Sequence, residues 1–233
     1  MSKNLIIAID GPAGSGKSTT AQIVAQKLGF VYIDTGAMYR AITYLAIRNN
    51  ALGNKDKIIE LAANSNIDLK FENGVTCISI NREDLTNKIR TLDVNKNVSD
   101  VSKIEEVRRI LVRKQRDIGS KTIGVVMEGR DIATVVFPNA DIKIFLTATI
   151  DKRAKRRAKE YAENGTNIPV TEIKENLKNR DQIDSNRKVS PLVKAKDAIV
   201  VDTSYVSIEE QVNIILNKVK KTADNLGIDV KIN

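Results

Sequence analysis

Short apolar runs of strand length alternate with amphipathic helical stretches along most of the chain. The strand-like runs are rich in β-branched residues, are followed by polar residues and lie at 5–9, 30–33, 123–127, 142–146 and 198–201. Helical stretches between them are expected at 37–48, at 101–118, from Thr171 towards Asn186, and after Ser207. This alternation is typical of a doubly wound, mostly parallel sheet, so we expect an α/β fold.

Two of the predicted helices carry the spacing of a capping box at their starts. Ser102 and Glu105 have this spacing in the stretch 101–118, and Ser207 and Glu210 have it before the last helical stretch. The last stretch also places apolar side chains on one face, at Ile208, Val212, Ile215, Leu216 and Val219. Thr171 is the expected cap of the helix that runs towards Asn186.

One segment interrupts the alternation of strands and helices. Two runs of alternating apolar and polar residues, 67–71 and 75–80, flank Asn73-Gly74. Asn-Gly between two such runs is a strong hairpin signal, because both residues accept a positive φ. Residues 63–90 are therefore expected to form a small antiparallel insertion in the otherwise parallel fold.

Residues 11–18 carry a complete phosphate-binding loop, Gly-Pro-Ala-Gly-Ser-Gly-Lys-Ser. An apolar strand-like run precedes the loop, and a helical face follows at Ala21, Val24, Ala25 and Leu28, with Gly29 as the expected cap. In such a loop backbone N–H groups surround the α- and β-phosphates, the lysine reaches the β- and γ-phosphates, and the serine hydroxyl takes a Mg²⁺ coordination position. The loop predicts binding of a nucleoside triphosphate at a helix N-terminus.

Composition narrows the class of protein. The 233 residues suit one α/β domain with an insertion, and the apolar runs are too short to span a membrane. The first strand begins within a few residues of Met1, which leaves no room for a signal peptide, and Cys77 is the only cysteine, so we expect a cytoplasmic protein. The chain has no histidine, which favours phosphoryl transfer, a reaction that depends on positioning and charge neutralisation.

The formal net charge of +9 permits several kinds of anionic partner, and aromatic residues are too few for a base-stacking platform. Charged residues follow four strands, at Asp10, 34–40, 128–131 and 202–204, where they form either surface turns with ion pairs or one anion site. The stretch 152–159 places Arg153, Arg156 and Arg157 on one helix face, which is a solvated face, a clamp over a polyphosphate or, third, a nucleic-acid patch. Arg180, Asp184 and Arg187 also share a face, either as a salt-bridge ladder or directed towards a substrate.

With these residues in view, nearly the whole chain resembles the bacterial cytidylate kinase family. The resemblance rests on residues 9–17, Asp-Thr-Gly-Ala-Met-Tyr-Arg at 34–40, Lys-Ile-Arg-Thr at 88–91, Glu-Gly-Arg-Asp at 128–131, 135–138, Arg180-Asp181 and 186–192. It implies a five-stranded parallel sheet in a single P-loop kinase domain spanning 1–233, a monophosphate-binding insertion at 63–90 and a short helical lid at 151–170. Glu128 stands where several members of the family carry Asp.

The resemblance also implies roles for individual residues. ATP binding is implied for Gly11, Pro12, Ala13, Gly14, Ser15, Gly16, Lys17, Ser18, Thr19 and Arg156, with Ser18 as the metal ligand for the Mg²⁺ carried with ATP. CMP binding is implied for Thr35, Tyr39, Arg40, Ser99, Arg108, Gly129, Arg130, Asp131, Arg180, Asp184 and Arg187. Within that set Arg40 and Arg130 hold the phosphate, Ser99, Arg108 and Asp131 read the cytosine, and Arg180 and Asp184 face the ribose. The catalytic residues are Lys17, Arg130, Arg156 and Arg187.

The implied reaction is direct in-line transfer of the γ-phosphate of ATP to CMP or dCMP. The acceptor phosphate is already anionic near neutral pH, so its oxygen can attack without a histidine base. The expected protein is a monomer that binds neither nucleic acid nor membrane. Two alternatives remain at this point: a P-loop regulatory or nucleic-acid-dependent ATPase, and a kinase that acts on another small acceptor.

Overall fold

The computed structural model describes residues 5–72, 75–163 and 165–232, and the turn predicted at Asn73-Gly74 lies outside them. The main sheet has the order β2-β6-β1-β7-β8, with all its paired strands parallel. Its strands are β1 (Leu5–Asp10), β2 (Val31–Asp34), β6 (Gly124–Gly129), β7 (Ile142–Thr147) and β8 (Ile199–Asp202). The predicted doubly wound α/β fold with five parallel strands is therefore confirmed.

Helices cover both faces of this sheet. Helices α1 (Lys17–Leu28) and α8 (Ile208–Leu226) pack one face, where Val24 and Ile215 join a core with residues of β1, β7 and β8. Helix α5 (Glu105–Gly119) and a π-helical turn, Ile132–Val136, cover the opposite face. The Ser207–Glu210 capping box that the sequence predicts is formed at the start of α8.

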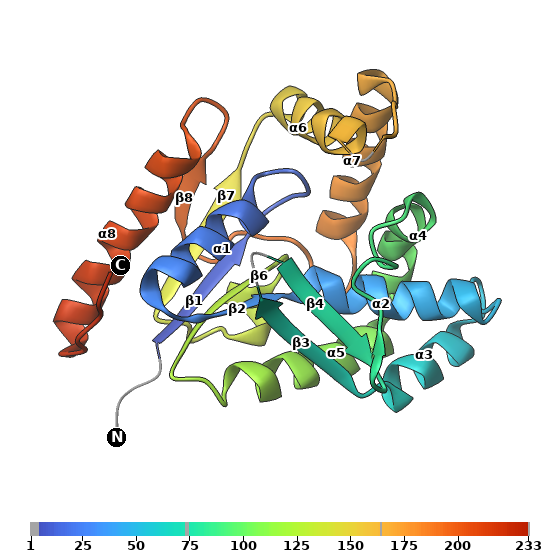
Figure 1. The fold of residues 1–233 in the computed structure, drawn as a ribbon, viewed down its shortest axis with the longest axis horizontal. Helices are drawn as coiled ribbons and strands as arrows, with labels where there is room; N and C mark the ends of the chain where they lie inside the picture. The colour runs from blue at the N-terminus through green and yellow to red at the C-terminus, as the bar shows by residue number, and fades with distance from the viewer. Residues whose placement is uncertain (1–4, 73–74, 164, 233) are drawn as a thin grey trace.

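A second apolar core lies beside the main sheet. It joins α2 (Thr35–Arg48), α3 (Lys55–Asn64), α4 (Leu92–Ser102) and α5 to a small antiparallel sheet. That sheet contains β3 (Ile67–Glu72), β4 (Val75–Ile80) and β5 (Glu83–Asp84), and Figure 1 shows β3 and β4 beside α2 and α5. The antiparallel insertion is thus confirmed as a structural unit. The sequence analysis did not predict α3 or the first part of α4.

Two predicted helix starts are wrong. The stretch 101–118 is divided between α4 and α5, because the chain leaves the helical conformation at Ile104. Ser102 lies at the end of α4, where its hydroxyl donates to the Ser99 carbonyl, and α5 has no side-chain cap. Thr171 lies inside α7 (Val170–Asn186), which begins after Pro169; proline fits this place because the first N–H groups of a helix have no intrahelical partner.

Helices α6 (Ile150–Glu163) and α7 form a pair at the end of the molecule where β7 finishes (Figure 1). Their apolar contacts reach the phosphate-binding loop, because Ala154, Ile173 and Leu177 form a small core with Ala13. Among the described residues no helix is both long enough and apolar enough to cross a membrane. The fold therefore brings the loop after β1, the loop after β6 and the pair α6–α7 to one edge of the sheet.

Candidate active site

The phosphate-binding loop has a backbone that requires glycine at its first position. Gly11 has a φ of +151°, and a Cβ atom there would lie 2.0 Å from the Leu146 carbonyl oxygen of β7. The loop ends at Gly16, which precedes α1 with a φ of 89° and provides no side-chain cap. The first N–H groups of α1 therefore have no capping side chain and can bind an anion at the positive end of the helix.

Lys17 is buried at the start of α1. Its Nζ donates to the Pro12 carbonyl at 2.7 Å and lies 3.5 Å from Ser15 Oγ. Burial and the nearby charge of Arg130 lower the pKa of Lys17 to about 7, although Glu128 and Asp10 act in the opposite direction. Because this ammonium group is buried beside other cations, an anion that enters the site stabilises its charged form.

Glu128, the buried carboxylate near the end of β6, lies beside Lys17 and Ser18. Its Oε1 accepts a hydrogen bond of 2.5 Å from Tyr32 of β2. Burial raises the pKa of Glu128, and the nearby Asp34 adds to this, while Lys17, Ser18 and Tyr32 counteract part of the shift. Ser18 and Glu128 therefore place two hard oxygen donors beside the phosphate loop, as a Mg²⁺ ion requires. Within the described residues no group of three carboxylate or cysteine side chains could hold a metal without help from substrate or water.

Asp10 joins the phosphate loop to the loop after β6. Its two carboxylate oxygens accept hydrogen bonds from the backbone N–H groups of Ile132 and Ala133, both at 2.8 Å. Burial raises the pKa of Asp10 to about 6, and these two hydrogen bonds limit the rise. The backbone directly after Arg130 and Asp131 is thus fixed by the residue directly before Gly11.

Asp184 of α7 lies between two arginines. Its Oδ2 accepts from Arg130 Nε at 2.9 Å, and its Oδ1 lies 3.3 Å from Arg187 Nη1. Burial alone would raise the pKa of Asp184, but Arg130, Arg187 and Arg180 together lower it. The alternative of a salt-bridge ladder along one helix face accounts only for the Asp184–Arg187 contact, because Arg130 approaches Asp184 from the loop after β6.

Arg180 has no hydrogen bond and no ion pair to any described residue. Burial and the charge of Arg130 lower the pKa of Arg180 to about 10, Arg40 and Arg157 lower it further, and only Asp184 raises it appreciably. Several guanidinium groups therefore lie within electrostatic reach of one another with too few carboxylates to balance them. Such a cluster is suited to binding phosphate.

The start of α2 supplies another part of this cationic group. Asp34 caps α2 by accepting from the Ala37 N–H, and it pairs with Arg40 at 2.7 Å and with Arg90 at 3.6 Å. Burial opposes ionisation of Asp34, but Arg40 and Arg90 hold the pKa of Asp34 below its usual value.

The first residue of α2 packs against the end of β6. The Thr35 hydroxyl donates a hydrogen bond to the Glu128 carbonyl at 2.7 Å. A Cβ atom on Gly129 would lie 2.6 Å from Thr35 Oγ1, so the two loops pack tightly only with glycine at 129.

The three residues implied in cytosine recognition come from α4, α5 and the loop after β6. Arg108 and Asp131 form an ion pair of 2.5 Å that is almost completely buried, and the Arg108 guanidinium also lies 5.0 Å from the centre of the Tyr39 ring. Ser99 is buried on α4, and its carbonyl accepts from Ser102. Two of these three side chains therefore contact each other directly in this structure.

The basic stretch of α6 is not one solvated face. Arg156 donates to the hydroxyl and carbonyl of Thr203, at 2.9 and 2.5 Å, and the Thr203 hydroxyl donates to the Ser15 carbonyl. Arg153 is buried and reaches the Ala13 carbonyl, while Arg157 lies over the Tyr161 ring. Within this stretch, the exposed residues are the lysines at 152, 155 and 159. The sequence analysis placed Arg153 on the same face as Arg156 but gave it no contact; no sequence signal distinguishes its burial.

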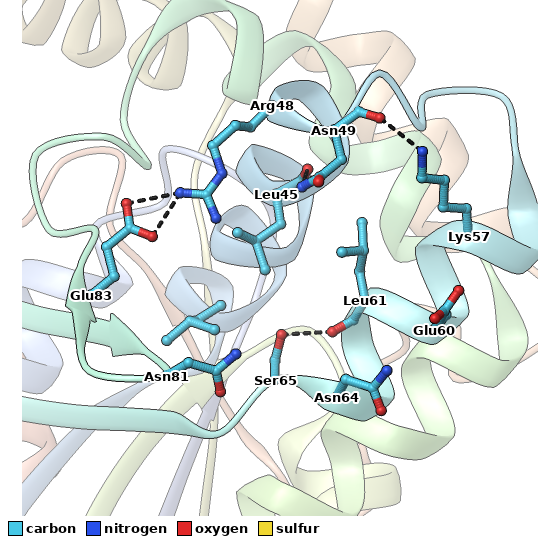
Figure 2. Close-up of a pocket in the computed structure, with 11 residues that line it drawn as sticks. Leu45, Arg48, Asn49, Lys57, Glu60, Leu61, Asn64, Ser65, Asn81 and Glu83 are labelled. Carbon is cyan, nitrogen blue, oxygen red and sulfur yellow. Dashed lines mark hydrogen bonds and ion pairs between the residues drawn. The ribbon is translucent and has the colours of Figure 1, made fainter.

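A separate pocket of about 410 Å³ lies away from these residues, between α2, α3 and the small sheet (Figure 2). Arg48 donates to both carboxylate oxygens of Glu83 at its rim, and Lys57 donates to the Asn49 carbonyl. None of the residues assigned to ATP or CMP lines it. This pocket is not part of the candidate active site.

A phosphate-binding loop at the edge of a parallel sheet, with cationic side chains gathered opposite it, defines a P-loop kinase. A solved structure of an uncharacterised protein from Eubacterium ventriosum shares this fold, with a TM-score of 0.54 at 13% identity, covering 94% of this chain and 99% of that one. The sequence profile described as cytidylate kinase matches residues 7–221. The chain belongs to the cytidylate kinase family.

Curated relatives agree over nearly the full length. A cytidylate kinase of Clostridioides difficile is 49% identical over 93% of this chain and 98% of the relative. Cytidylate kinases of Alkaliphilus oremlandii and Bacillus subtilis are 50% and 46% identical, over 92% and 95% of this chain and 97% and 99% of the respective relatives. The family predicted from the sequence motifs is therefore confirmed.

Proposed function

We propose that this site transfers the γ-phosphoryl group of ATP directly to the phosphate of CMP or dCMP, giving ADP and CDP or dCDP. Membership of the family assigns the reaction: the chain is an enzyme that phosphorylates CMP with ATP. The observation that supports the residue assignments is electrostatic. The charge of Arg130 lowers the pKa of both Lys17, at the donor loop, and Arg180, on α7. Arg130 also donates to Asp184 of α7 at 2.9 Å, so the donor loop and the acceptor face of α7 lie within electrostatic reach of the same guanidinium group.

On the donor side, the loop from Gly11 to Ser18 and the start of α1 bind the ATP phosphates. Lys17 exchanges its hydrogen bond to the Pro12 carbonyl for contacts with the β- and γ-phosphates. These anions favour the charged form of the buried lysine. Arg156 lies against the same loop through Thr203 and can turn towards the transferring group. Charge spread over the γ-phosphate in the transition state is then stabilised by groups that are already oriented.

On the acceptor side, Arg40 and Arg130 hold the CMP phosphate, and Arg180 and Asp184 face the ribose. Each of the two phosphate ligands is paired with a carboxylate here, Asp34 and Asp184 respectively, so each is oriented before the substrate arrives. Arg187 approaches the transferring group; its Nη2 is buried and has no hydrogen-bond partner among the described residues. Tyr39, Ser99, Arg108 and Asp131 supply the side that reads the base, with Thr35 and Gly129 shaping the loop contact.

A Mg²⁺ ion carried with ATP would supply neutralisation of phosphate charge. Ser18 is exposed beside the loop and Glu128 lies next to it, so these two residues would hold the ion directly or through water. Because Mg²⁺ retains several waters and phosphate ligands, two protein oxygens suffice for a cation carried by its substrate.

Residues 63–90 are proposed as the monophosphate-binding unit, and residues 151–170 as a lid that excludes water during transfer. We also propose a monomer in the cytoplasm that binds neither nucleic acid nor membrane. A regulatory or nucleic-acid-dependent ATPase is not favoured, since the family match covers residues 7–221.

A coupled assay of ADP release over a panel of acceptors tests this function. The wild-type chain should respond to CMP and dCMP far more than to UMP or AMP, and DNA should not stimulate it. Lys17→Ala should lose most turnover while remaining folded, and Arg130→Ala should raise the KM for CMP much more than that for ATP. Stimulation by DNA without any response to CMP would contradict the proposal.

A further inference from the structure

The outer side of the phosphate-binding loop is held by two arginines of α6 that are one helical turn apart. Arg153 Nη1 donates to the Ala13 carbonyl at 3.2 Å, and Arg156 reaches the Ser15 carbonyl through the Thr203 hydroxyl. In a loop whose N–H groups point at phosphate, carbonyl oxygens point away from the phosphate and need other hydrogen-bond donors. The Ala13 carbonyl accepts directly from α6, and the Ser15 carbonyl accepts from Thr203, which α6 contacts in turn. The conformation of the loop is thus tied to the position of α6.

Arg153 has more partners than Arg156, and they come from three segments. Besides the Ala13 carbonyl it donates from Nε, at 3.0 Å, to the carbonyl of Ala148, which lies two residues before the start of α6. Its Nη2 lies 2.7 Å from Asp181 Oδ2 on α7. The side chain is 8% exposed, so solvent screens these contacts little. Three different nitrogens of the planar guanidinium make these contacts, an arrangement that a single ammonium nitrogen does not reproduce.

Asp181 connects Arg153 to the acceptor side of the site. This residue directly follows Arg180, which has no hydrogen bond or ion pair among the described residues, and lies one helical turn before Asp184. The other oxygen of Asp181, Oδ1, is buried and has no hydrogen bond to any part of the chain that the structure describes, so Arg153 is the charged partner that holds this carboxylate. The backbone that carries Arg180 is therefore connected to the Ala13 carbonyl through a single side chain.

We propose that Arg153 is a positioning residue. Together with Asp181 it fixes the position of the phosphate-binding loop, which binds the donor, relative to the part of α7 that carries Arg180 and Asp184 and binds the acceptor. This role rests on the proposed function, because it matters only if two phosphates must meet between the loop and α7. In this role Arg153 acts through the Ala13 carbonyl and through the helix that carries Arg180. A displacement of about 1 Å between reacting groups can reduce turnover about 100-fold.

The chain offers a matched control in a second ion pair that also joins α6 to α7. Lys174 of α7 lies 2.6 Å from Asp151 of α6, but both side chains are more exposed than Arg153 and neither contacts the phosphate loop in the described contacts. Lys174→Gln removes this connection between the helices and leaves the loop contacts intact. Comparison with this variant therefore separates two effects: the position of the phosphate-binding loop relative to α7, and the attachment of α6 to α7 in general.

The test compares wild type, Arg153→Lys, Asp181→Asn and Lys174→Gln. Calorimetry measures binding of a non-hydrolysable ATP analogue, which does not depend on the acceptor, and steady-state assays measure kcat and the KM for CMP. Arg153→Lys keeps the charge but replaces three separate donor nitrogens with one, so we expect kcat to fall about 10- to 100-fold and the analogue to bind more weakly. Asp181→Asn leaves both carbonyl contacts of Arg153, so we expect lower kcat and higher KM for CMP with analogue binding within about twofold of wild type.

Lys174→Gln should match wild type within about twofold in every measurement. The positioning role is wrong if Asp181→Asn behaves like Lys174→Gln, or if Arg153→Lys binds the analogue as tightly as wild type. If Arg153→Lys does not fold, the nearly isosteric Asp181→Asn decides through its KM for CMP. A wild type without CMP-dependent ADP release would contradict the proposed function instead, and analogue binding by Arg153→Lys would still test the donor half of the role.

Discussion

Arg108 of α5 and Asp131 of the loop after β6 form an ion pair of 2.5 Å, in which both side chains are at most 5% exposed. Removing one partner from such a pair leaves an uncompensated buried charge, which costs about 3–5 kcal/mol. We therefore expect Arg108→Leu to lower the free energy of unfolding by about that amount. The double variant Arg108→Leu with Asp131→Asn should lose less than the sum of the single variants. Urea denaturation of the three variants and wild type measures this, and a loss below about 1 kcal/mol in Arg108→Leu would contradict the interpretation.

Asp10→Asn tests the link between the donor loop and the acceptor loop. Asparagine offers one acceptor oxygen where Asp10 uses two, so either Ile132 or Ala133 loses its N–H partner. Because the affected backbone follows Arg130 and Asp131, we expect the KM for CMP to rise several-fold and the KM for ATP to change less. Steady-state kinetics with each substrate varied in turn measures the split. A larger effect on ATP would place the influence of Asp10 in the phosphate loop alone.

The same residue predicts a response to acid. The pKa of Asp10 is raised to about 6, so protonation below that pH removes acceptor capacity from the contacts with Ile132 and Ala133. We expect kcat/KM for CMP in wild type to fall more steeply below pH 6 than in Asp10→Asn. The phosphate of CMP titrates equally in both assays, so the ratio of wild type to variant isolates Asp10. A ratio that is constant between pH 5 and pH 7 would exclude this effect.

Lys17 predicts a response at the alkaline side. Its pKa is lowered to about 7 without ligand, so the free protein loses the Lys17 charge as the pH rises through 7. The ATP phosphates favour the charged form, and binding above this pH must therefore take up a proton. We expect affinity for a non-hydrolysable ATP analogue to fall by up to about tenfold per pH unit between pH 7.5 and 9. Calorimetry in two buffers of different ionisation enthalpy measures the proton uptake; pH-independent affinity without uptake would show that Lys17 is already charged.

Tyr32→Phe tests the assignment of Glu128 to Mg²⁺. Tyr32 orients Glu128 through a 2.5 Å hydrogen bond, and loss of a residue that orients a metal ligand commonly costs about 10- to 100-fold in metal affinity or activity. We expect the Mg²⁺ concentration for half-maximal activity to rise about tenfold or more, with turnover partly restored at high Mg²⁺. Chelation of Mg²⁺ should abolish activity in wild type and variant alike. An unchanged Mg²⁺ requirement would limit Tyr32 to packing against Phe71, whose ring centre lies 4.9 Å away.

Much of the fold follows from local sequence. The five strands of the main sheet, the phosphate loop, the Gly29 cap and the Ser207 capping box depend on residues adjacent in the chain, and all were predictable. The division at Ile104 was not, because the predicted capping box matched a helix start and only the packing of α4 and α5 places the break elsewhere. The π-helical turn at Ile132–Val136 depends on Asp10, which is more than a hundred residues away.

The sequence by itself determined the chemistry: a phosphate loop, arginines at strand ends and a reaction that needs no histidine. Tertiary structure decided which cation has which neighbour. Arg153, Arg156 and Arg157 belong to one basic stretch, yet only Arg153 is buried against the Ala13 carbonyl and Asp181. The reason is physical: charge and periodicity are properties of a segment, whereas burial and the pairing of charges depend on where other segments lie. Tertiary structure also decides that Arg180 has no ion pair among the described residues, although Asp184 lies within electrostatic reach of it.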